Sequence, residues 1–246
     1  LCERDHRTIP SLNFRKSLAE HANTHENCVG KLDFERIWVK NPFRSNLAPP
    51  ILNTIGEMYR KNGWKFTDRS LYNSMLIEEP PEGCEQHPNI TRCLATSHIY
   101  TTRLATIDFI KEGVPVWILD HIRPRIVIRE FVVPRSGYAA RYRMRVIANL
   151  PKEMNSHVRD ADDHVDSCDF PSVWREEERE WPHWTHESKW EQVEICLEDY
   201  PAGIRTISVT SGGKDTQSTD YAEEYNGVKI ANLEIHLEMP NVVRWL

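Results

Sequence analysis

The chain has 246 residues, of which 39% are hydrophobic and 28% are charged, a composition typical of a folded globular protein. This composition excludes a collagen-like, low-complexity or wholly disordered chain. The net charge of −6 argues against a protein whose whole surface follows nucleic acid. No apolar run approaches the roughly 18 residues that a membrane helix needs. We therefore expect neither a nucleic-acid partner nor a membrane span.

The first part of the chain is polar and compatible with a helix, with Leu12 and Leu18 at helical spacing. We therefore expect a helical leader over residues 1–34 and one large domain over residues 35–246. Because the chain begins at Leu1 rather than Met, we expect it to be a fragment of a longer protein.

The apolar groups that follow are short and many of them alternate with polar residues. In residues 141–146 (RYRMRV) every second residue is cationic, which is typical of an antiparallel strand with one face in water. One short helix is expected near residues 113–121. Many short strands without a βαβ rhythm predict a mainly β fold, an antiparallel sandwich or jelly roll. Strands are expected at residues 64–66, 126–133, 142–148, 193–197, 204–209 and 228–237.

Negative charge is concentrated in residues 151–200, which hold 15 acidic and 5 basic residues. The densest parts are residues 160–169 and residues 175–180 (REEERE). Charge-dense segments seldom bury enough apolar area to order themselves. We interpret these two segments mainly as solvated connections between strands.

Potential metal donors gather in residues 157–168, where two histidines, four aspartates and one cysteine lie within twelve residues. Their spacing matches neither a zinc ribbon, nor an HExxH helix, nor an EF-hand loop. The chain also lacks a GxSxG elbow, a P-loop and a GxGxxG turn. We therefore expect no metal, no cofactor and no catalytic residue.

The cysteines are scattered without a CxxC pair, and no apolar segment at the start resembles a secretory signal. This pattern favours a reducing compartment, the cytosol or the nucleus. The six positions are Cys2, Cys28, Cys84, Cys93, Cys168 and Cys196.

Two groups of aromatic residues are candidates for binding. Exposed aromatic rings can stack on sugars, but core packing at the edge of the sandwich is the simpler interpretation of the tryptophans. Tyr221 and Tyr225 lie instead in a polar stretch, residues 216–226, where loop aromatics are better binding candidates. The four neighbouring tryptophans are Trp174, Trp181, Trp184 and Trp190.

Several short motifs, in order, resemble the F-box-associated domain family. Residues 199–205 (DYPAGIR) and 211–216 (SGGKDT) closely resemble its paired signature, and residues 227–232 (GVKIAN) resemble its last core strand. Residues 62–65 (NGWK) and 123–130 (RPRIVIRE) are similar to the family in order and spacing. Together the motifs indicate membership over most of the chain.

The resemblance covers roughly residues 35–238 and implies a jelly-roll-like β-sandwich of about ten antiparallel strands. In complete members of the family an F-box precedes this domain and binds the adaptor subunit of a cullin-RING, or SCF-type, ubiquitin ligase. Residues 1–5 resemble the tail of such an F-box. The resemblance therefore implies a non-catalytic, cytoplasmic substrate receptor that holds a protein or glycoprotein for ubiquitination.

Sugar-recognising members of the family bind high-mannose N-glycans through a Tyr-Trp-Lys run shortly after a Gly-Gly-x-Asp turn. Here the aligned residues 216–226 contain neither Trp nor Lys, and an acidic sugar-binding position falls on Gly137. Losing such buried donors and acceptors typically costs about 1–3 kcal/mol each. We therefore favour recognition of a protein substrate. The expected substrate-binding residues are Tyr138, Asp220, Tyr221 and Tyr225.

Two other functions stay open at this point. In a lectin-like module that works without a ligase, Tyr221 and Tyr225 would replace the lost aromatic platform. A jelly-roll hydrolase would need two carboxylates converging in a cleft. The sequence singles out no such pair.

Overall fold

The computed structural model describes residues 42–61, 64–66, 74–149, 173–182, 188–217 and 225–239. A short helix, α3 (Ile55–Lys61), precedes the strands, and a π-helix, η3 (Ile118–Ile122), follows the fourth of them. The strands are β1 (Lys65–Phe66), β2 (Met75–Glu78), β3 (Cys93–Thr96), β4 (Thr101–Asp108), β5 (Arg125–Pro134), β6 (Ala140–Ala148), β7 (Trp174–Trp181), β8 (Glu191–Leu197), β9 (Thr206–Asp215) and β10 (Val228–Glu238).

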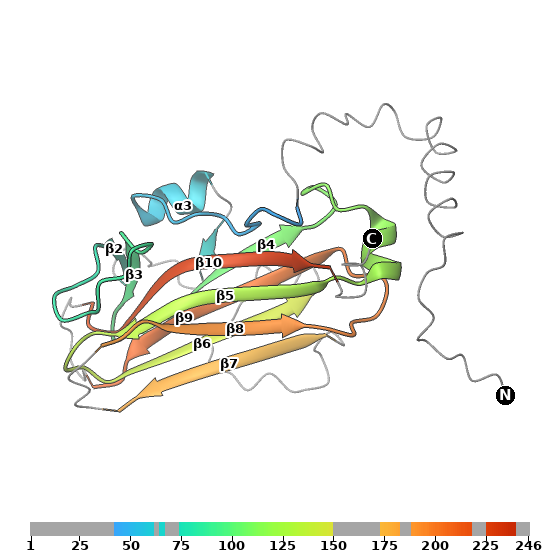
Figure 1. Ribbon diagram of the computed structural model, residues 1–246. Coiled ribbons are helices and arrows are strands. Elements are labelled where there is room, and N and C mark those ends of the chain that lie inside the picture. Colours follow the sequence, from blue (N-terminus) through green and yellow to red (C-terminus); the bar gives the residue numbers. More distant parts are fainter. Residues whose placement is uncertain are drawn as a thin grey trace.

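These strands form two antiparallel sheets of five strands that pack face to face (Figure 1). The first sheet has the order β1-β4-β9-β6-β7 and the second has the order β2-β3-β10-β5-β8. Among the described strands, only β2–β3 and β6–β7 follow each other within one sheet. The chain therefore crosses between the sheets repeatedly, and the mainly β sandwich expected from the sequence is confirmed.

All six strands expected from the sequence are present, as β1, β5, β6, β8, β9 and β10. Strands β2, β3 and β4 were not predicted. The helix expected near residues 113–121 begins later than predicted, because turns occupy residues 109–113, helical backbone starts at residue 116 and η3 spans Ile118–Ile122. Three other expectations concern segments that lie outside the described residues. They are the helical leader over residues 1–34, the group of potential metal donors at 157–168 and the acidic connection at 160–169.

The interpretation of residues 175–180 as a solvated connection was wrong, because they form most of β7. Strand β7 pairs with β6 in register, so its glutamates face the arginines of β6. Arg145 Nη2 lies 2.5 Å from Glu176 Oε2, and Arg143 forms ion pairs with both Glu176 and Glu178. The charged residues that suggested a loop are therefore the β7 partners in a ladder of ion pairs between β7 and β6.

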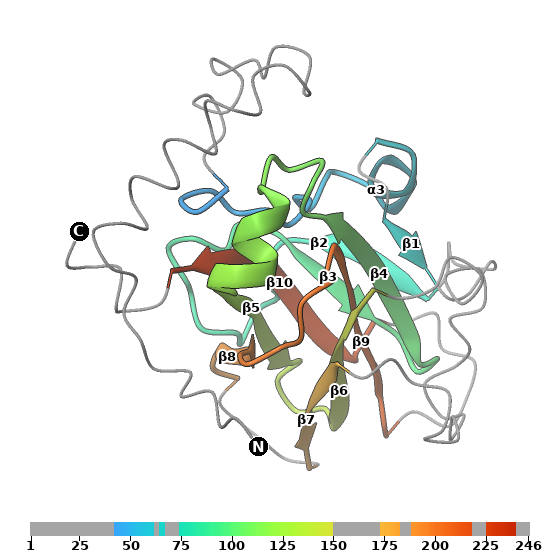
Figure 2. The same cartoon turned by 90° about the vertical axis from the view of Figure 1, so that its right-hand side faces the viewer.

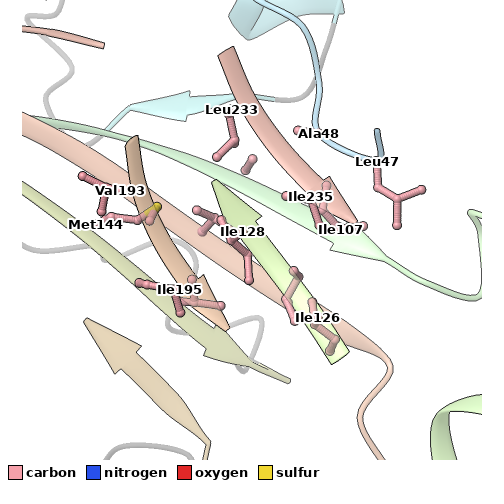
Figure 3. Packing of buried hydrophobic residues seen from close by; sticks show 14 of the residues in the cluster. Leu47, Ala48, Ile107, Ile126, Ile128, Met144, Val193, Ile195, Leu233 and Ile235 are labelled. Carbon is pink, nitrogen blue, oxygen red and sulfur yellow. The ribbon is translucent and has the colours of Figure 1, made fainter. Parts of the chain in front are cut away.

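The main core lies between the two sheets, as the alternation of buried residues requires. Figure 3 shows Ile128 of β5 and Ile195 of β8 packing with Met144 of β6 in the opposite sheet. A smaller apolar cluster lies on the outer face of the second sheet, beneath the β2–β3 connection. It consists of Ile90, Cys93, Val133, Trp190 and Ala231, with Cys84 and Phe131 packed against it.

The tryptophans separate by position. Trp181 and Trp190 retain 8% and 9% of their surface and belong to the two apolar clusters, as the core interpretation predicts. Trp174, at the start of β7, is 39% exposed and contacts the guanidinium of Arg145 at 5.9 Å from the ring centroid. Trp184 lies outside the described residues.

The sandwich also buries a polar cluster that bridges its two sheets. Arg103 of β4 and Glu130 of β5 form an ion pair in which both side chains are fully buried. The hydroxyl of Tyr142 donates to Glu130 Oε2 at 2.7 Å, and the Arg103 guanidinium lies 4.6 Å from the centroid of the Trp64 ring. Because solvent does not reach it, this cluster is structural.

The Gly-Gly pair of the signature lies within β9 and not in a turn. A Cβ atom on Gly212 would come within 2.1 Å of the Thr101 carbonyl oxygen, and one on Gly213 within 2.3 Å of the Arg141 carbonyl oxygen. The two glycines therefore let β4 and β6 approach β9 closely from either side.

Two further residues of the signature, Gly203 and Arg205, fasten the β8–β9 connection at one end of the sandwich, which we call the far end. Asp120 accepts hydrogen bonds from both Nη1 and Nη2 of Arg205, each at 2.8 Å, and from the Gly203 N–H at 2.8 Å. Asn149 accepts from the Arg205 N–H at 2.8 Å and donates to the Gly203 carbonyl at 2.9 Å. Figure 2 looks along the sandwich with η3 toward the viewer. These residues thus have an architectural role.

Candidate functional site

The opposite end of the sandwich, here called the turn end, brings together three loops at the left of Figure 1. They are the β3–β4 loop (residues 97–100), the β5–β6 loop (135–139) and the β9–β10 loop (216–227). Three backbone hydrogen bonds join them: Asp215 N–H to Ser97 O at 2.8 Å, Gly227 N–H to Thr96 O at 2.8 Å, and Thr216 N–H to Ala139 O at 3.0 Å.

Two glycines shape the loops at this end. A Cβ atom on Gly227 would lie 2.3 Å from Thr96 Oγ1, so the close approach of β10 to β3 requires glycine there. Gly137 has φ = +81° and sits in a turn closed by the Tyr138 N–H donating to the Arg135 carbonyl at 3.0 Å. The turn places Tyr138 beside the start of the β9–β10 loop.

The structure places two of the four predicted substrate-binding residues. Tyr138 and Tyr225 are both half-buried and both lie at the turn end, one on the β5–β6 loop and one on the β9–β10 loop. Asp220 and Tyr221 lie outside the described residues. The roles of all four in binding stay predictions.

A buried lysine supports the end of the β9–β10 loop. Lys229 is fully buried, donates to the Tyr225 carbonyl, and lies 2.9 Å from Glu78 Oε1. Burial lowers the pKa of Lys229, and the Glu78 carboxylate opposes that shift. The Lys229 side chain on β10 therefore holds the backbone of the β9–β10 loop in place at Tyr225.

Two polar residues of the β3–β4 loop escaped the sequence-based prediction. The Tyr100 hydroxyl and His98 Nδ1 are buried and have no hydrogen-bond partner among the described residues. Burial raises the pKa of Tyr100 to about 12, so its phenol is neutral and able to donate. These two residues were not predicted because neither β3 nor β4, the strands that this loop connects, was recognised from the sequence.

Charged side chains flank the turn end on the outer face of the first sheet. Arg141 Nη2 lies 3.3 Å from Glu178 Oε2, and Arg143 binds the same carboxylate. Burial opposes ionisation of Glu178, but hydrogen bonds from Arg143 and Arg141 outweigh it and lower the pKa of Glu178. These charges satisfy one another within the sheet.

The described part of the turn end offers phenols, backbone groups and a buried histidine nitrogen in a frame held by strands. Such an arrangement suits recognition by stacking and hydrogen bonding. Within the described ranges, no group of three or more His, Cys, Asp or Glu side chains is arranged to hold a metal ion. The described helices also include none long and apolar enough to cross a membrane.

A family model of the F-box associated region matches residues 38–236. The chain belongs to the F-box associated family. In the structure, one part of the family signature supplies Arg205, which donates hydrogen bonds to Asp120 at the far end. The other part supplies Gly212, where β4 approaches β9 closely.

Curated relatives of this F-box associated chain are F-box only proteins. It is 26% identical to mouse F-box only protein 6 over 236 residues, which cover 94% of this chain and 72% of the mouse protein. It is 30% identical to bovine F-box only protein 6 over 129 residues, covering 52% of this chain and 42% of the bovine protein.

Solved structures that match the chain share little sequence with it. A structure of TmCBM61 in complex with β-1,4-galactotriose has a TM-score of 0.41 and 11% identity, covering 78% of this chain and 99% of that module. The CBM22-2 xylan-binding domain of Paenibacillus barcinonensis Xyn10C has a TM-score of 0.36 and 12% identity, covering 75% and 97%.

Proposed function

We propose that this chain is the substrate-recognition part of an SCF-type ubiquitin ligase, which holds a protein or glycoprotein for ubiquitination. Membership of the F-box associated family and the relation to F-box only protein 6 support this proposal. In it the chain is a non-catalytic, cytoplasmic receptor. The ligase adaptor binds an F-box that precedes the domain.

The observation that carries the proposal is the construction of the turn end. Its three loops connect six strands, three from each sheet, and backbone hydrogen bonds of 2.8–3.0 Å hold them together. Binding surfaces on loops that a rigid scaffold positions lose little entropy when a partner binds. In the proposal, Tyr138 and Tyr225 contact the substrate, together with Asp220 and Tyr221.

Replacement of the tyrosines tests the substrate site. The double variant Tyr138→Ala/Tyr225→Ala should retain about a tenth or less of the bound substrate proteins, as expected when two aromatic anchors are lost. The measurement is quantitative mass spectrometry of proteins co-precipitated with the full-length protein in cells. Tyr59→Ala is the matched control, because Tyr59 is 60% exposed on α3, outside the turn-end loops.

The proposal for the substrate site fails if the double variant retains the same proteins as the Tyr59→Ala control. Adaptor binding is measured in the same precipitates. It should be unchanged in both variants and should disappear when the F-box is deleted. If the natural full-length protein does not bind the adaptor, the ligase assignment is wrong and only a binding module remains.

A titration with chitobiose separates a protein receptor from a lectin-like module. We expect no binding at millimolar sugar, because the residues aligned with the sugar-stacking run contain neither Trp nor Lys. Binding at or below millimolar concentration that Tyr221→Ala abolishes would instead establish the lectin. Isothermal calorimetry with wild type and this variant makes the measurement.

A further inference from the structure

The β2–β3 connection encloses a hollow that the turn-end site does not use. Residues 79–91 line a cavity of about 810 Å³ that is open to solvent. Its walls combine prolines, Ile90, Cys84 and His87 with three glutamates. The volume lies within the range of about 300–1,000 Å³ that is usual for binding sites in proteins.

This cavity is built on a fixed support. The Glu85 N–H donates to the Ser188 carbonyl at 2.9 Å, and the indole of Trp190 donates to the Glu85 carbonyl at 3.0 Å. Asn232 of β10 donates to the Asn89 carbonyl at 2.8 Å, which fastens the other side. Prolines at positions 80, 81 and 88 restrict the backbone further. A ligand would therefore bind to a surface whose backbone is already held in place.

The charged side chains that line the cavity are negative, and the positive charge of Arg135 on the β5–β6 loop acts on the lining residue Cys84 from outside the lining. Glu79, Glu82 and Glu85 are exposed, and none of them forms an ion pair with another described residue. No lysine or arginine is among the lining residues. The buried ammonium group of Lys229 is already paired with Glu78. Directly behind the wall, the buried hydroxyl of Ser188 has no partner in the described part of the chain.

The carboxylates are not arranged as a metal site. The described residues contain no group of three or more metal-ligating side chains, although three glutamates and His87 line one cavity. Separated carboxylates along an open groove instead suit several cations spaced along a polypeptide. The prolines and Ile90 would then contact the aliphatic stems of those side chains.

We propose that the cavity within residues 79–91 is a docking groove for an extended protein segment that carries lysines or arginines. The charge of the groove selects the cations and its apolar walls bind their stems. The groove is independent of the ligase assignment, because it requires only a basic segment on a partner protein.

A short peptide with alternating lysines tests the proposal, with the peptide in which glutamates replace the lysines as the reference. Fluorescence anisotropy with the whole chain should show binding of the lysine peptide only. In Glu79→Gln/Glu82→Gln/Glu85→Gln the Kd should rise about tenfold, as expected when several ion pairs of modest strength are lost. The side chains replaced are exposed, so the fold is retained.

A matched variant controls for net charge. Glu180→Gln/Glu194→Gln/Glu198→Gln removes three negative charges from exposed positions on β7, on β8 and just after β8. Its Kd should stay within about twofold of wild type, because distant exposed charges are screened. Equal weakening in both triple variants would show nonspecific attraction and overturn the proposal, as would equal binding of the two peptides.

Cys84 supplies a reporter inside the groove. It is a free, half-buried thiol that lines the cavity, whereas the free thiol of Cys196 lies on the outer face of β8 beside Arg125. The lysine peptide should slow alkylation of Cys84 several-fold and leave Cys196 unchanged, as read by peptide mass spectrometry. Unchanged alkylation of Cys84 at saturating peptide would place binding elsewhere and refute the groove.

Discussion

At the scale of single residues, the ion pair of Arg103 and Glu130 joins the two sheets at fully buried positions. Removing two charges from water is costly, and the cost is recovered only while both partners and their hydrogen bonds are present. Tyr142 and Ser211 add hydrogen bonds, at 2.7 Å to Glu130 and 3.2 Å to Arg103, while Arg103 Nη1 has no partner among the described residues. Stability should therefore depend sharply on each partner.

We expect Arg103→Met to lower the free energy of unfolding by about 3–5 kcal/mol, because it leaves Glu130 as an unpaired buried charge. Adding Glu130→Gln should restore part of the loss, because the amide is neutral and still accepts from Tyr142. Urea unfolding followed by circular dichroism gives both values. A loss below about 1 kcal/mol for the single variant would contradict a structural role for the pair.

Asp120 carries a pH dependence at the far end. Hydrogen bonds from Arg205 and Gly203 hold the pKa of Asp120 at about 2, below its ordinary value of 3.8. A depressed pKa stabilises the folded state above the unfolded pKa, and this stabilisation is lost as pH falls from about 4 through about 2. Asp120→Asn should therefore lower the Tm at neutral pH, and its difference from wild type should shrink near pH 2.

Thermal unfolding of wild type and Asp120→Asn at several pH values makes this measurement. Asp199→Asn serves as the control, because Asp199 is exposed and has φ = +53°, a conformation that asparagine tolerates. A difference in Tm between wild type and Asp120→Asn that does not change with pH would show that Asp120 acts only through packing.

At the scale of elements, strands with a regular alternation could be predicted from the sequence. In β6 the buried residues Tyr142, Met144 and Val146 alternate with arginines, and the structure shows that pattern without exception from Ala140 to Val146. Strands β3 and β4 gave no such signal. The sequence of β3, CLAT, is buried throughout, and β4 hides Arg103 among its buried residues.

Strand β7 was missed for a different reason. Its side chains are nearly all charged, and composition alone suggested a loop. The arginines of β6 lie 30 to 40 residues earlier, and only the pairing register reveals that they face Glu176 and Glu178. The loop position of Tyr225 was predictable from the polar stretch around it, but its role in binding and that of Tyr138 stay predictions. The β2–β3 groove was not predictable, because it depends on contacts with Trp190 and Asn232 that are remote in sequence.

The ladder predicts a measurable coupling between β6 and β7. Arg143→Ala and Glu178→Ala should show a coupling free energy of about 0.5–1 kcal/mol in a double-mutant cycle, decreasing as salt is added. Arg143→Ala combined with Glu234→Ala, which lies in the other sheet, should be additive. Equal coupling in the two cycles would mean that the β6–β7 ion pairs contribute nothing specific.

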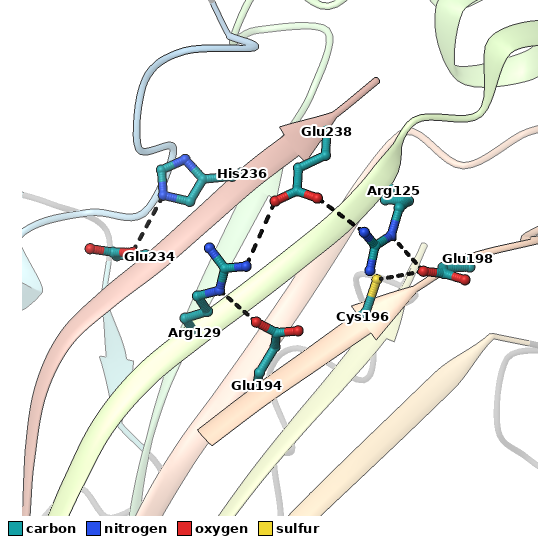
Figure 4. Close-up of polar contacts among 8 residues, drawn as sticks. All are labelled: Arg125, Arg129, Glu194, Cys196, Glu198, Glu234, His236 and Glu238. Carbon is teal, nitrogen blue, oxygen red and sulfur yellow. Dashed lines mark hydrogen bonds and ion pairs between the residues drawn. The ribbon is translucent and has the colours of Figure 1, made fainter. Parts of the chain in front are cut away.

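The outer face of the second sheet also carries a ladder of ion pairs between neighbouring strands. Figure 4 shows Arg125 and Arg129 of β5 lying among Glu194, Glu198 and Glu238, with Arg129 Nε 2.6 Å from Glu194 Oε2. Both outer faces thus carry polar ladders, beside the smaller apolar cluster that the β2–β3 connection covers on the second sheet, and the main apolar core lies between the sheets. This division explains how a chain with 28% charged residues forms a sandwich with a continuous core.

At the scale of the whole molecule, the boundary between leader and domain stays a prediction. We expect residues 35–246 alone to unfold cooperatively with a Tm within about 2 °C of the whole chain. The reason is that Leu47 is the first buried hydrophobic residue in the part of the chain that the structure describes, and its N–H donates to the Ile235 carbonyl at 3.0 Å. Thermal unfolding and the dispersion of amide NMR signals test this. A truncated chain that is unfolded would move the boundary toward the N-terminus.

The strand order has a consequence for synthesis on the ribosome. The central strands of the two sheets, β9 and β10, are also the last two of the described strands in the sequence, and so are translated after the others. Until β10 emerges, β2–β3 and β5–β8 are two separate pairs with open edges, and Asn46 lacks its partner Leu233, 187 residues later. Open edges attract other chains. The nascent domain therefore depends on protection from aggregation until β10 has been synthesised, and any premature stop before residue 228 would leave both halves of the second sheet unjoined.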